Sequence, residues 1–131
     1  MKQWWIVLVG LGLLVACSAE PPEPLVKELA QQRWTALLQS NPTKAYQYYT
    51  KAFQDTTPLK QFENSIRGVG LWRSAQVMDA QCKDSQCQVN VKVTVAMKMR
   101  GLPEPIETSE VIQETWMKDT AWKSEWRYVK N

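Results

Sequence analysis

Three patterns of hydrophobic and polar positions follow one another along this chain. An unbroken apolar segment, Trp4 to Ala16, comes first and is preceded by Lys2. Between Pro24 and Ile66, apolar residues recur at intervals of three or four, the period of a helix with one buried face. After Gly70 the period changes to two, as in a strand with one buried face. The patterns therefore predict an α+β domain in which helices precede a sheet.

The helical region divides into three predicted helices. The first covers residues 24–40, and its apolar face consists of Leu25, Val26, Leu29, Ala30, Trp34, Leu37 and Leu38. Asn41 and Pro42 form a cap and first-turn pair that opens the second helix. The apolar side of that helix carries Ala45, Tyr46, Tyr49, Ala52 and Phe53. Thr57 and Pro58 open a short third helix through Leu59, Phe62 and Ile66.

Gly68 is suited to end the third helix, because glycine readily adopts the left-handed conformation. Residues 87–99 then alternate without an error, and one face collects Val89, Val91, Val93, Val95, Met97 and Met99. A strand with one polar face predicts antiparallel pairing. If Cys82 faces Cys87 across a hairpin, a register without bulges has these opposed pairs: Ala80 with Val89, Met78 with Val91, and Trp72 with Met97.

Two further strands are predicted over residues 105–117 and 122–129, joined by a turn at residues 118–120. One face of the last strand carries Trp122, Ser124, Trp126 and Tyr128. The apolar residues of the strand before it fall on both faces: Val111, Ile112, Trp116 and Met117. A bulge, a covered outer face or a different placement of the strand would each explain this pattern. The sheet is expected to have about four strands.

Charge and composition exclude several classes of function. The chain has 16 basic and 13 acidic residues, a net charge of +3 without a basic cluster, so we expect no nucleic-acid partner. Histidine, the commonest general acid or base, is absent. Its absence argues against the usual hydrolytic triads and zinc sites. With only 5 glycines there is no glycine-rich phosphate loop, and we expect neither a metal nor another cofactor.

The apolar segment closes with Leu14, Val15, Ala16 and Cys17, a run that resembles the bacterial lipobox. The resemblance implies that the Cys17 thiol is acylated with palmitate-type chains, that cleavage makes Cys17 the first residue, and that its new amine is acylated as well. An uncleaved membrane anchor and an ordinary secretory signal are the alternatives. A helix of residues 4–16 would span about 20 Å, against about 30 Å of hydrocarbon core, which disfavours permanent spanning.

This interpretation divides the chain into a signal peptide at 1–16, a lipidated cysteine and proline-rich tether at 17–24, and a single domain at 25–131. We expect a lipoprotein of the bacterial cell envelope, attached to a membrane by its lipid. Ser18 after the cysteine resembles the pattern directed to the outer membrane, facing the periplasm, in a bacterium with two membranes. An exported compartment is oxidising, so Cys82 and Cys87 are predicted to form a disulfide.

The order of elements resembles the nuclear transport factor 2-like superfamily, whose fold is a cone. The matching features are the aromatic Trp34 of the first helix, the run Lys44-Ala45-Tyr46-Gln47-Tyr48-Tyr49, the helix start Thr57-Pro58-Leu59-Lys60-Gln61-Phe62, and the closing Trp116 to Trp126 hairpin. The resemblance implies a curved antiparallel sheet that folds around the three helices and forms a pocket. Some members use this pocket as an active site, and many use it only for binding.

We therefore predict a non-enzymatic binding module that contacts an envelope protein or a small apolar ligand, with Tyr46, Tyr49, Trp122 and Trp126 as candidate contacts. One alternative is an enzyme of the ketosteroid isomerase kind. It would use Asp55 or Asp79 as base, with Tyr46 or Tyr49 in an oxyanion hole. Another is a structural component of a secretion or conjugation apparatus.

Overall fold

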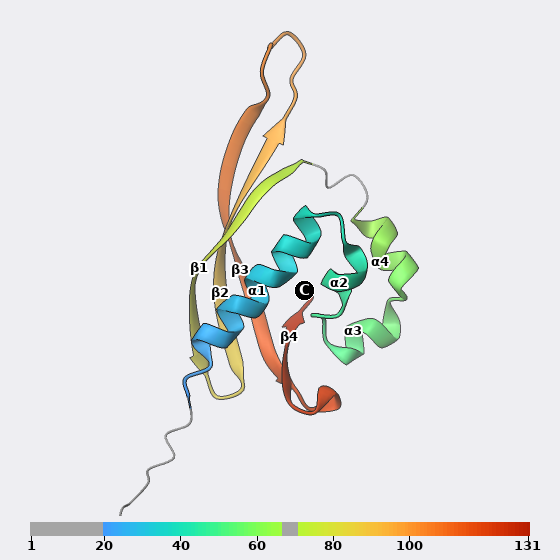
Figure 1. Ribbon diagram of the computed structural model, residues 1–131, viewed down its shortest axis with the longest axis vertical. Helices are drawn as coiled ribbons and strands as arrows, with labels where there is room; N and C mark the ends of the chain where they lie inside the picture. Colours follow the sequence, from blue (N-terminus) through green and yellow to red (C-terminus); the bar gives the residue numbers. More distant parts are fainter. Residues whose placement is uncertain (1–19, 67–70) are drawn as a thin grey trace, which may run out of the picture.

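The computed structural model describes residues 20–66 and 71–131, where helices are followed by one antiparallel sheet (Figure 1). The helices are α1 (Glu23–Leu38), α2 (Pro42–Tyr46), α3 (Lys51–Thr56) and α4 (Leu59–Ser65). The strands are β1 (Trp72–Lys83), β2 (Gln86–Met97), β3 (Ile106–Asp119) and β4 (Glu125–Val129), with a 3-10 turn η1 (Thr120–Trp122) before β4. The α+β class is confirmed, whereas the expectation of three helices is wrong: this part of the chain has four. Cys17 and Gly68 lie outside the described residues.

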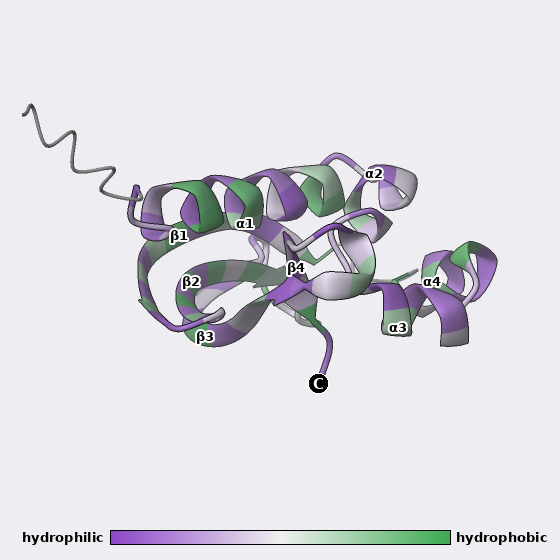
Figure 2. Cartoon of the chain, turned by 90° about the horizontal axis from the view of Figure 1, so that it is seen from below, coloured by the Kyte–Doolittle hydropathy of each residue, from purple (hydrophilic) through white to green (hydrophobic). Residues whose placement is uncertain are grey.

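Helix α1 lies along one side of the curved sheet and packs mainly against β1 (Figure 2). Its buried stripe consists of Val26, Ala30, Arg33, Trp34, Ala36 and Leu37. Leu25 was expected in this face but is 50% exposed. Consecutive residues of a helix point about 100° apart, so Leu25 is turned away from the stripe that Val26 begins.

The predicted second helix is two short helices, because the main chain bonds to the sheet within the four residues that separate them. Asn41 caps α2 as expected, its side chain accepting a hydrogen bond from the Lys44 amide. After α2, the Tyr128 amide donates to the Tyr48 carbonyl, and the Thr50 amide donates to the Tyr128 carbonyl. These bonds to β4 replace helical bonds, and the Thr50 hydroxyl then caps α3.

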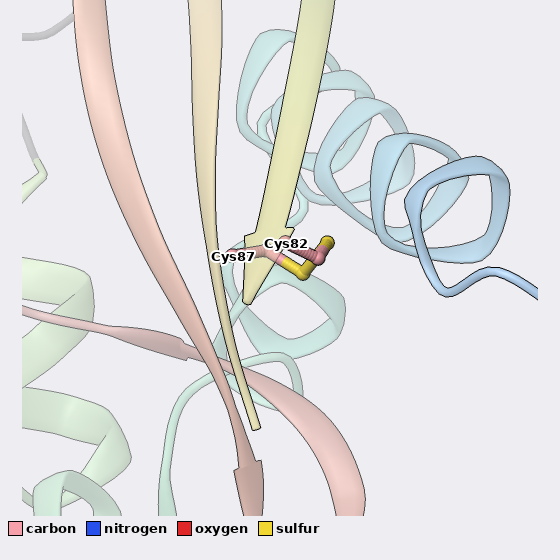
Figure 3. Close-up of a disulfide and its surroundings, with 2 residues drawn as sticks. All are labelled: Cys82 and Cys87. Carbon is pink, nitrogen blue, oxygen red and sulfur yellow. A yellow bond between two sulfur atoms is a disulfide. The ribbon is translucent and has the colours of Figure 1, made fainter. Parts of the chain in front are cut away.

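The sheet has the order β1-β2-β3-β4, and the Cys82–Cys87 disulfide joins β1 to β2 beside their turn (Figure 3). The predicted pairs Cys82 with Cys87 and Ala80 with Val89 are confirmed. Beyond them the register shifts, so that Val91 faces Val77 instead of Met78, and Val95 faces Trp72. Met78 lies in the irregularity and is 49% exposed.

Strand β3 pairs with β2 without a break, so a bulge between these strands does not explain its apolar residues on both faces. Trp116 is buried, whereas Val111 and Met117 are exposed. The strand runs to Asp119, through most of the predicted turn. Trp122 lies in η1 and Ser124 has a positive φ of 57°, so β4 begins only at residue 125.

The β2–β3 hairpin extends past the start of β1 and past the helices at one end of the molecule, while α1 begins toward the other end (Figure 1). Met97 and Met99 were expected on the buried face but are about half exposed. Both residues belong to the end of the hairpin that projects past the helices, so no helix among the described residues covers them (Figure 1). The core lies instead between α1, α2, α4 and the lower part of the sheet, and includes Val26, Trp34, Ala45, Tyr49, Phe62, Val89, Val91 and Trp116.

Candidate functional site

A polar cluster occupies the interior between α1 and the sheet, where the fold resemblance predicted a pocket. Its centre is an ion pair in which Arg33 Nη1 of α1 lies 2.8 Å from Glu114 Oε2 of β3. Arg33 is 5% exposed and Glu114 is 3% exposed. Each residue lies on the buried face of its element. Arg33 belongs to the buried stripe of α1, and Glu114 shares a strand face with Ile112 and Trp116. We call Arg33, Glu114 and the aromatic residues around them the interior cluster.

Aromatic residues surround both charges. The indole nitrogens of Trp34 and Trp116 donate to the two oxygens of Glu114, at 2.8 Å and 3.3 Å. Arg33 Nη2 donates to the Tyr49 hydroxyl at 2.8 Å, and the guanidinium carbon lies 3.7 Å from the centroid of the Tyr128 ring. Several donors thus satisfy the carboxylate, and the cation lies against π-faces that stabilise positive charge.

This environment shifts the pKa values of Arg33 and Tyr128. Burial by itself lowers the pKa of Arg33, but Tyr49, Glu114 and Tyr128 outweigh it and leave that pKa above the usual value. Burial raises the pKa of Tyr128, an effect that the nearby Arg33 partly opposes. The interior cluster therefore holds Arg33 as a cation and Tyr128 as a neutral phenol.

The chemistry open to this cluster is limited by access. The Arg33 and Glu114 side chains are nearly inaccessible, so a substrate would reach them only if the aromatic residues moved. Arg33 Nε is buried without a hydrogen-bond partner among the described residues. Among the described residues, the cluster orients α1 on the sheet through polar bonds and leaves the Glu114 carboxylate almost fully buried.

The candidate contact residues are dispersed. The Tyr46 hydroxyl donates to the carbonyls of Gln54 and Thr57, which ties α2 to the chain after it. Tyr49 belongs to the interior cluster. Trp126 is buried on β4, and half-buried Trp122 lies in η1 with Arg127 over its ring. These four side chains do not form one surface.

The aspartates proposed for the alternative enzyme also lie apart. Asp55 is exposed on α3 and pairs with Lys51 at 2.7 Å. Asp79 is exposed on β1, where its carboxylate accepts from the Asn90 amide. Neither aspartate makes a hydrogen bond to Tyr46 or Tyr49, whose hydroxyls bond elsewhere. The structure therefore does not bring either aspartate together with Tyr46 or Tyr49.

A shallow depression of about 500 Å³ lies between α3, the end of β3 and the end of β4. It is lined by Thr50, Ala52, Phe53, Thr56, Met117, Asp119, Val129 and Lys130. The Asp119 carboxylate is already engaged by the amides of Lys51 and Ala121. Among residues 20–66 and 71–131, no group of acidic, cysteine or histidine side chains is placed to hold a metal ion. No helix in the same ranges is long and apolar enough to cross a membrane.

No family model matches the chain, and no curated protein matches its sequence. Solved structures do share its fold. A SEC-C motif containing protein from Psychrobacter arcticus has a TM-score of 0.59 at 19% identity, over 80% of this chain and 58% of that protein. A second SEC-C motif containing protein, from Rhodopseudomonas palustris, has a TM-score of 0.55 at 13% identity, with 78% and 73% covered.

A protein named as an NTF2-like transpeptidase, from Campylobacter jejuni, has a TM-score of 0.52 at 13% identity, over 81% of this chain and 98% of that one. The domain is therefore an NTF2-like α+β fold. Identities this low establish the fold and carry no activity across to this chain. The chain corresponds to little more than half the length of the Psychrobacter protein.

Sequence reasoning missed both charges of the interior cluster, although the sequence carried a signal for each. Glu114 lies between Ile112 and Trp116 in a period of two, which places a carboxylate on the apolar face of β3. Arg33 follows Val26 and Ala30 at helical spacing. A cation and an anion that each interrupt an apolar face are candidates for a buried pair.

Proposed function

We propose that the protein is a lipid-anchored module of the bacterial envelope that acts by binding, without catalysis. The observation that carries the binding role is the filled interior. The region that would serve an NTF2-like enzyme as its cleft holds the Arg33–Glu114 pair and the rings of Trp34, Trp116 and Tyr128. A partner would then be bound on the outside of the domain.

The lipid anchor is supported by the sequence before the domain. Leu14 to Cys17 has the lipobox pattern, and the proline-rich segment proposed as a tether, residues 18–24, runs into α1, which begins at Glu23. The Cys82–Cys87 disulfide agrees with an oxidising compartment such as the periplasm. Stable anchoring needs more than one acyl chain, and the lipobox cysteine is the residue that would carry several.

Labelling of bacterial cells with an alkyne analogue of palmitate tests the anchor. We expect the wild-type protein to incorporate label and Cys17→Ser to accumulate as unlabelled precursor. The matched control is a Cys82→Ser and Cys87→Ser double variant, which also lacks cysteines but keeps the acceptor. Equal label in wild type and Cys17→Ser would contradict the lipoprotein assignment.

Substitution of the two aspartates tests the choice between binding and catalysis. Asp55→Asn and Asp79→Asn, singly and together, remove the carboxylates that the isomerase-like alternative needs. Because both are exposed, we expect an unchanged melting midpoint, and we expect each variant to complement a deletion strain as well as the wild-type protein does. A double variant that folds and still captures its partners, yet behaves like the deletion strain, would support the enzyme instead.

A further inference from the structure

The β3 strand has an unpaired edge on the projecting hairpin. Strand β2 pairs with β3 from Ile106 to Met117, whereas β4 pairs with it at Thr115–Asp119. Residues 106–114 therefore have a neighbouring strand on one side only. Within the described residues, no backbone or side-chain group bonds to the main chain of this second side. We call residues 106–114 the open edge.

The main-chain groups that face outward along the open edge follow from the register. The Lys118 amide donates to the Ser85 carbonyl, so even-numbered residues of β3 direct their main-chain groups toward β2. The register is unbroken, and hydrogen bonding alternates along an antiparallel strand. The N–H and C=O groups of Glu107, Ser109, Val111 and Gln113 consequently point to the unpaired side.

The opposite edge of the sheet is protected in a way that the open edge is not. On β1, the Gln31 side chain donates to the Ala75 carbonyl and accepts from the Val77 amide, taking the place of a neighbouring strand. Two register shifts also interrupt β1. Such devices prevent pairing with other chains. Along β3, residues 106–111 are all exposed, and Val111 reaches 58%.

We propose that the open edge binds an extended segment of a partner protein, added to the sheet as a strand, with basic residues opposite Glu107 and Glu110. The inference rests on the proposed binding role and names its site. Main-chain hydrogen bonds provide the affinity in strand addition, and side-chain contacts provide specificity. Opposite charges directly across a ladder stabilise pairing. The two glutamates lie three positions apart, so the segment would carry Lys or Arg with the same spacing.

The charges disfavour a second copy of this chain as the occupant. The sequence of the open edge contains three glutamates and no lysine or arginine. Pairing of two such edges would gather the exposed carboxylates of both copies on one ribbon without a cation. The exposed Arg73 of β1 lies near this edge, with its Nε 4.0 Å from Glu107 Oε1. An exposed pair at this distance contributes little and leaves Glu107 free to exchange partners.

The test uses the full-length protein in mild detergent and a fluorescent synthetic peptide of about nine residues, the length of a strand. The peptide alternates valine and threonine and carries two lysines three positions apart. The matched peptide has glutamates in their place. By fluorescence anisotropy at low salt, we expect the lysine peptide to bind at least about tenfold more tightly than the glutamate peptide. The reason is that two pairs of opposite charge with Glu107 and Glu110 replace two pairs of like charge. Glu107→Lys with Glu110→Lys should reverse the preference.

A second pair of variants separates main-chain from side-chain contributions. Val111→Pro removes an outward amide that the structure leaves unpaired, and proline is tolerated on strand edges. We expect it to abolish peptide binding, while Val111→Ala keeps the amide and retains most of the affinity. Hydrogen exchange should slow at the amides of Glu107, Ser109, Val111 and Gln113 when the lysine peptide is bound.

Three outcomes would overturn the inference: equal affinity for the two peptides, binding that survives Val111→Pro, or a wild-type dimer through this edge in analytical ultracentrifugation. Peptide binding does not require Cys17, so these results are independent of the acylation test. If the peptide does not bind as expected but Val111→Pro still captures partners in cells, the binding site lies elsewhere on the domain. The proposed binding function would then still hold.

Discussion

A buried ion pair costs several kcal/mol per ion to dehydrate, and its surroundings decide whether that cost is recovered. In the interior cluster, Glu114 accepts from Arg33, Trp34 and Trp116, and Arg33 lies against the Tyr128 ring. Each charge is compensated in part by groups from another element. The cluster therefore fixes the position of α1 on the sheet with directional bonds, which an apolar contact would not provide.

Substitution of one partner of the Arg33–Glu114 pair should destabilise the fold, because the other charge is then buried without its partner. Glu114→Gln leaves the Arg33 cation buried without its anion, and we expect a loss of about 3 kcal/mol or more in the free energy of unfolding, measured by urea denaturation. Glu110→Gln, an exposed position on the same strand, is the control and should change stability by less than about 0.5 kcal/mol. A Glu114→Gln variant as stable as the control would mean that the pair contributes nothing to the fold.

The tyrosines predict a loss of stability in alkali. Burial raises the pKa of Tyr128, Tyr48 and Tyr46 above the ordinary value of 10.0. A group whose pKa is raised by folding contributes its full stabilisation below the unfolded pKa and loses it as pH rises toward the folded pKa. We expect the melting midpoint to stay level up to about pH 10 and to fall above it. Tyr128→Phe should reduce the slope of this fall, and an identical slope would contradict the assignment to Tyr128.

At the scale of elements, periodicity predicted what depends on local sequence. The Asn41 cap and the alternation of Val89, Val91 and Val93 are local features, and both are confirmed. The α1 stripe is confirmed in part, because Leu25 is exposed. The break between α2 and α3 was missed because the competing bonds come from Tyr128, which is distant in sequence. The irregularity at Met78 was missed because alternation alone does not distinguish a regular ladder from one with an extra residue.

The candidate site was less predictable than the fold. Tyrosines and tryptophans were chosen one by one for their chemistry, and the structure distributes them over α2, η1, β4 and the interior cluster. The Arg33–Glu114 pair requires that a helix and a strand 81 residues apart face each other, which periodicity does not specify. The open edge likewise depends on where β4 stops pairing with β3.

The disulfide fixes the register of one hairpin more than it stabilises the whole domain. Its cysteines are only 5 positions apart, and the entropic stabilisation from closing a loop grows with loop length, so this short loop contributes little. We expect the Cys82→Ser and Cys87→Ser double variant to lose about 2 kcal/mol or less in urea denaturation. Hydrogen exchange should accelerate in β1 and the adjoining part of β2 and remain unchanged in α1. Complete unfolding of the double variant would show that the bond holds the whole fold together.

At the scale of the whole molecule, the two proposed functional parts lie apart. Helix α1, which follows the proposed anchor in the sequence, begins toward one end of the long axis, and the β2–β3 hairpin projects at the other (Figure 1). The domain between them has a filled core and an NTF2-like fold. If the proposed lipid anchor holds α1 near a membrane, this arrangement would place the open edge away from that membrane, where it could meet an extended segment of a partner protein.

This separation predicts that the open edge can be altered without affecting the proposed anchor. A photo-crosslinking amino acid at Gln113, within the open edge, should give a partner adduct in cells that is lost in the Glu107→Lys and Glu110→Lys variant. That variant should keep its palmitate label and its melting midpoint, because both side chains are exposed. Cys17→Ser should lose the label and most of the adduct, since anchoring raises the local concentration of a membrane-bound partner. A full adduct yield in Cys17→Ser would show that partner binding does not depend on the membrane.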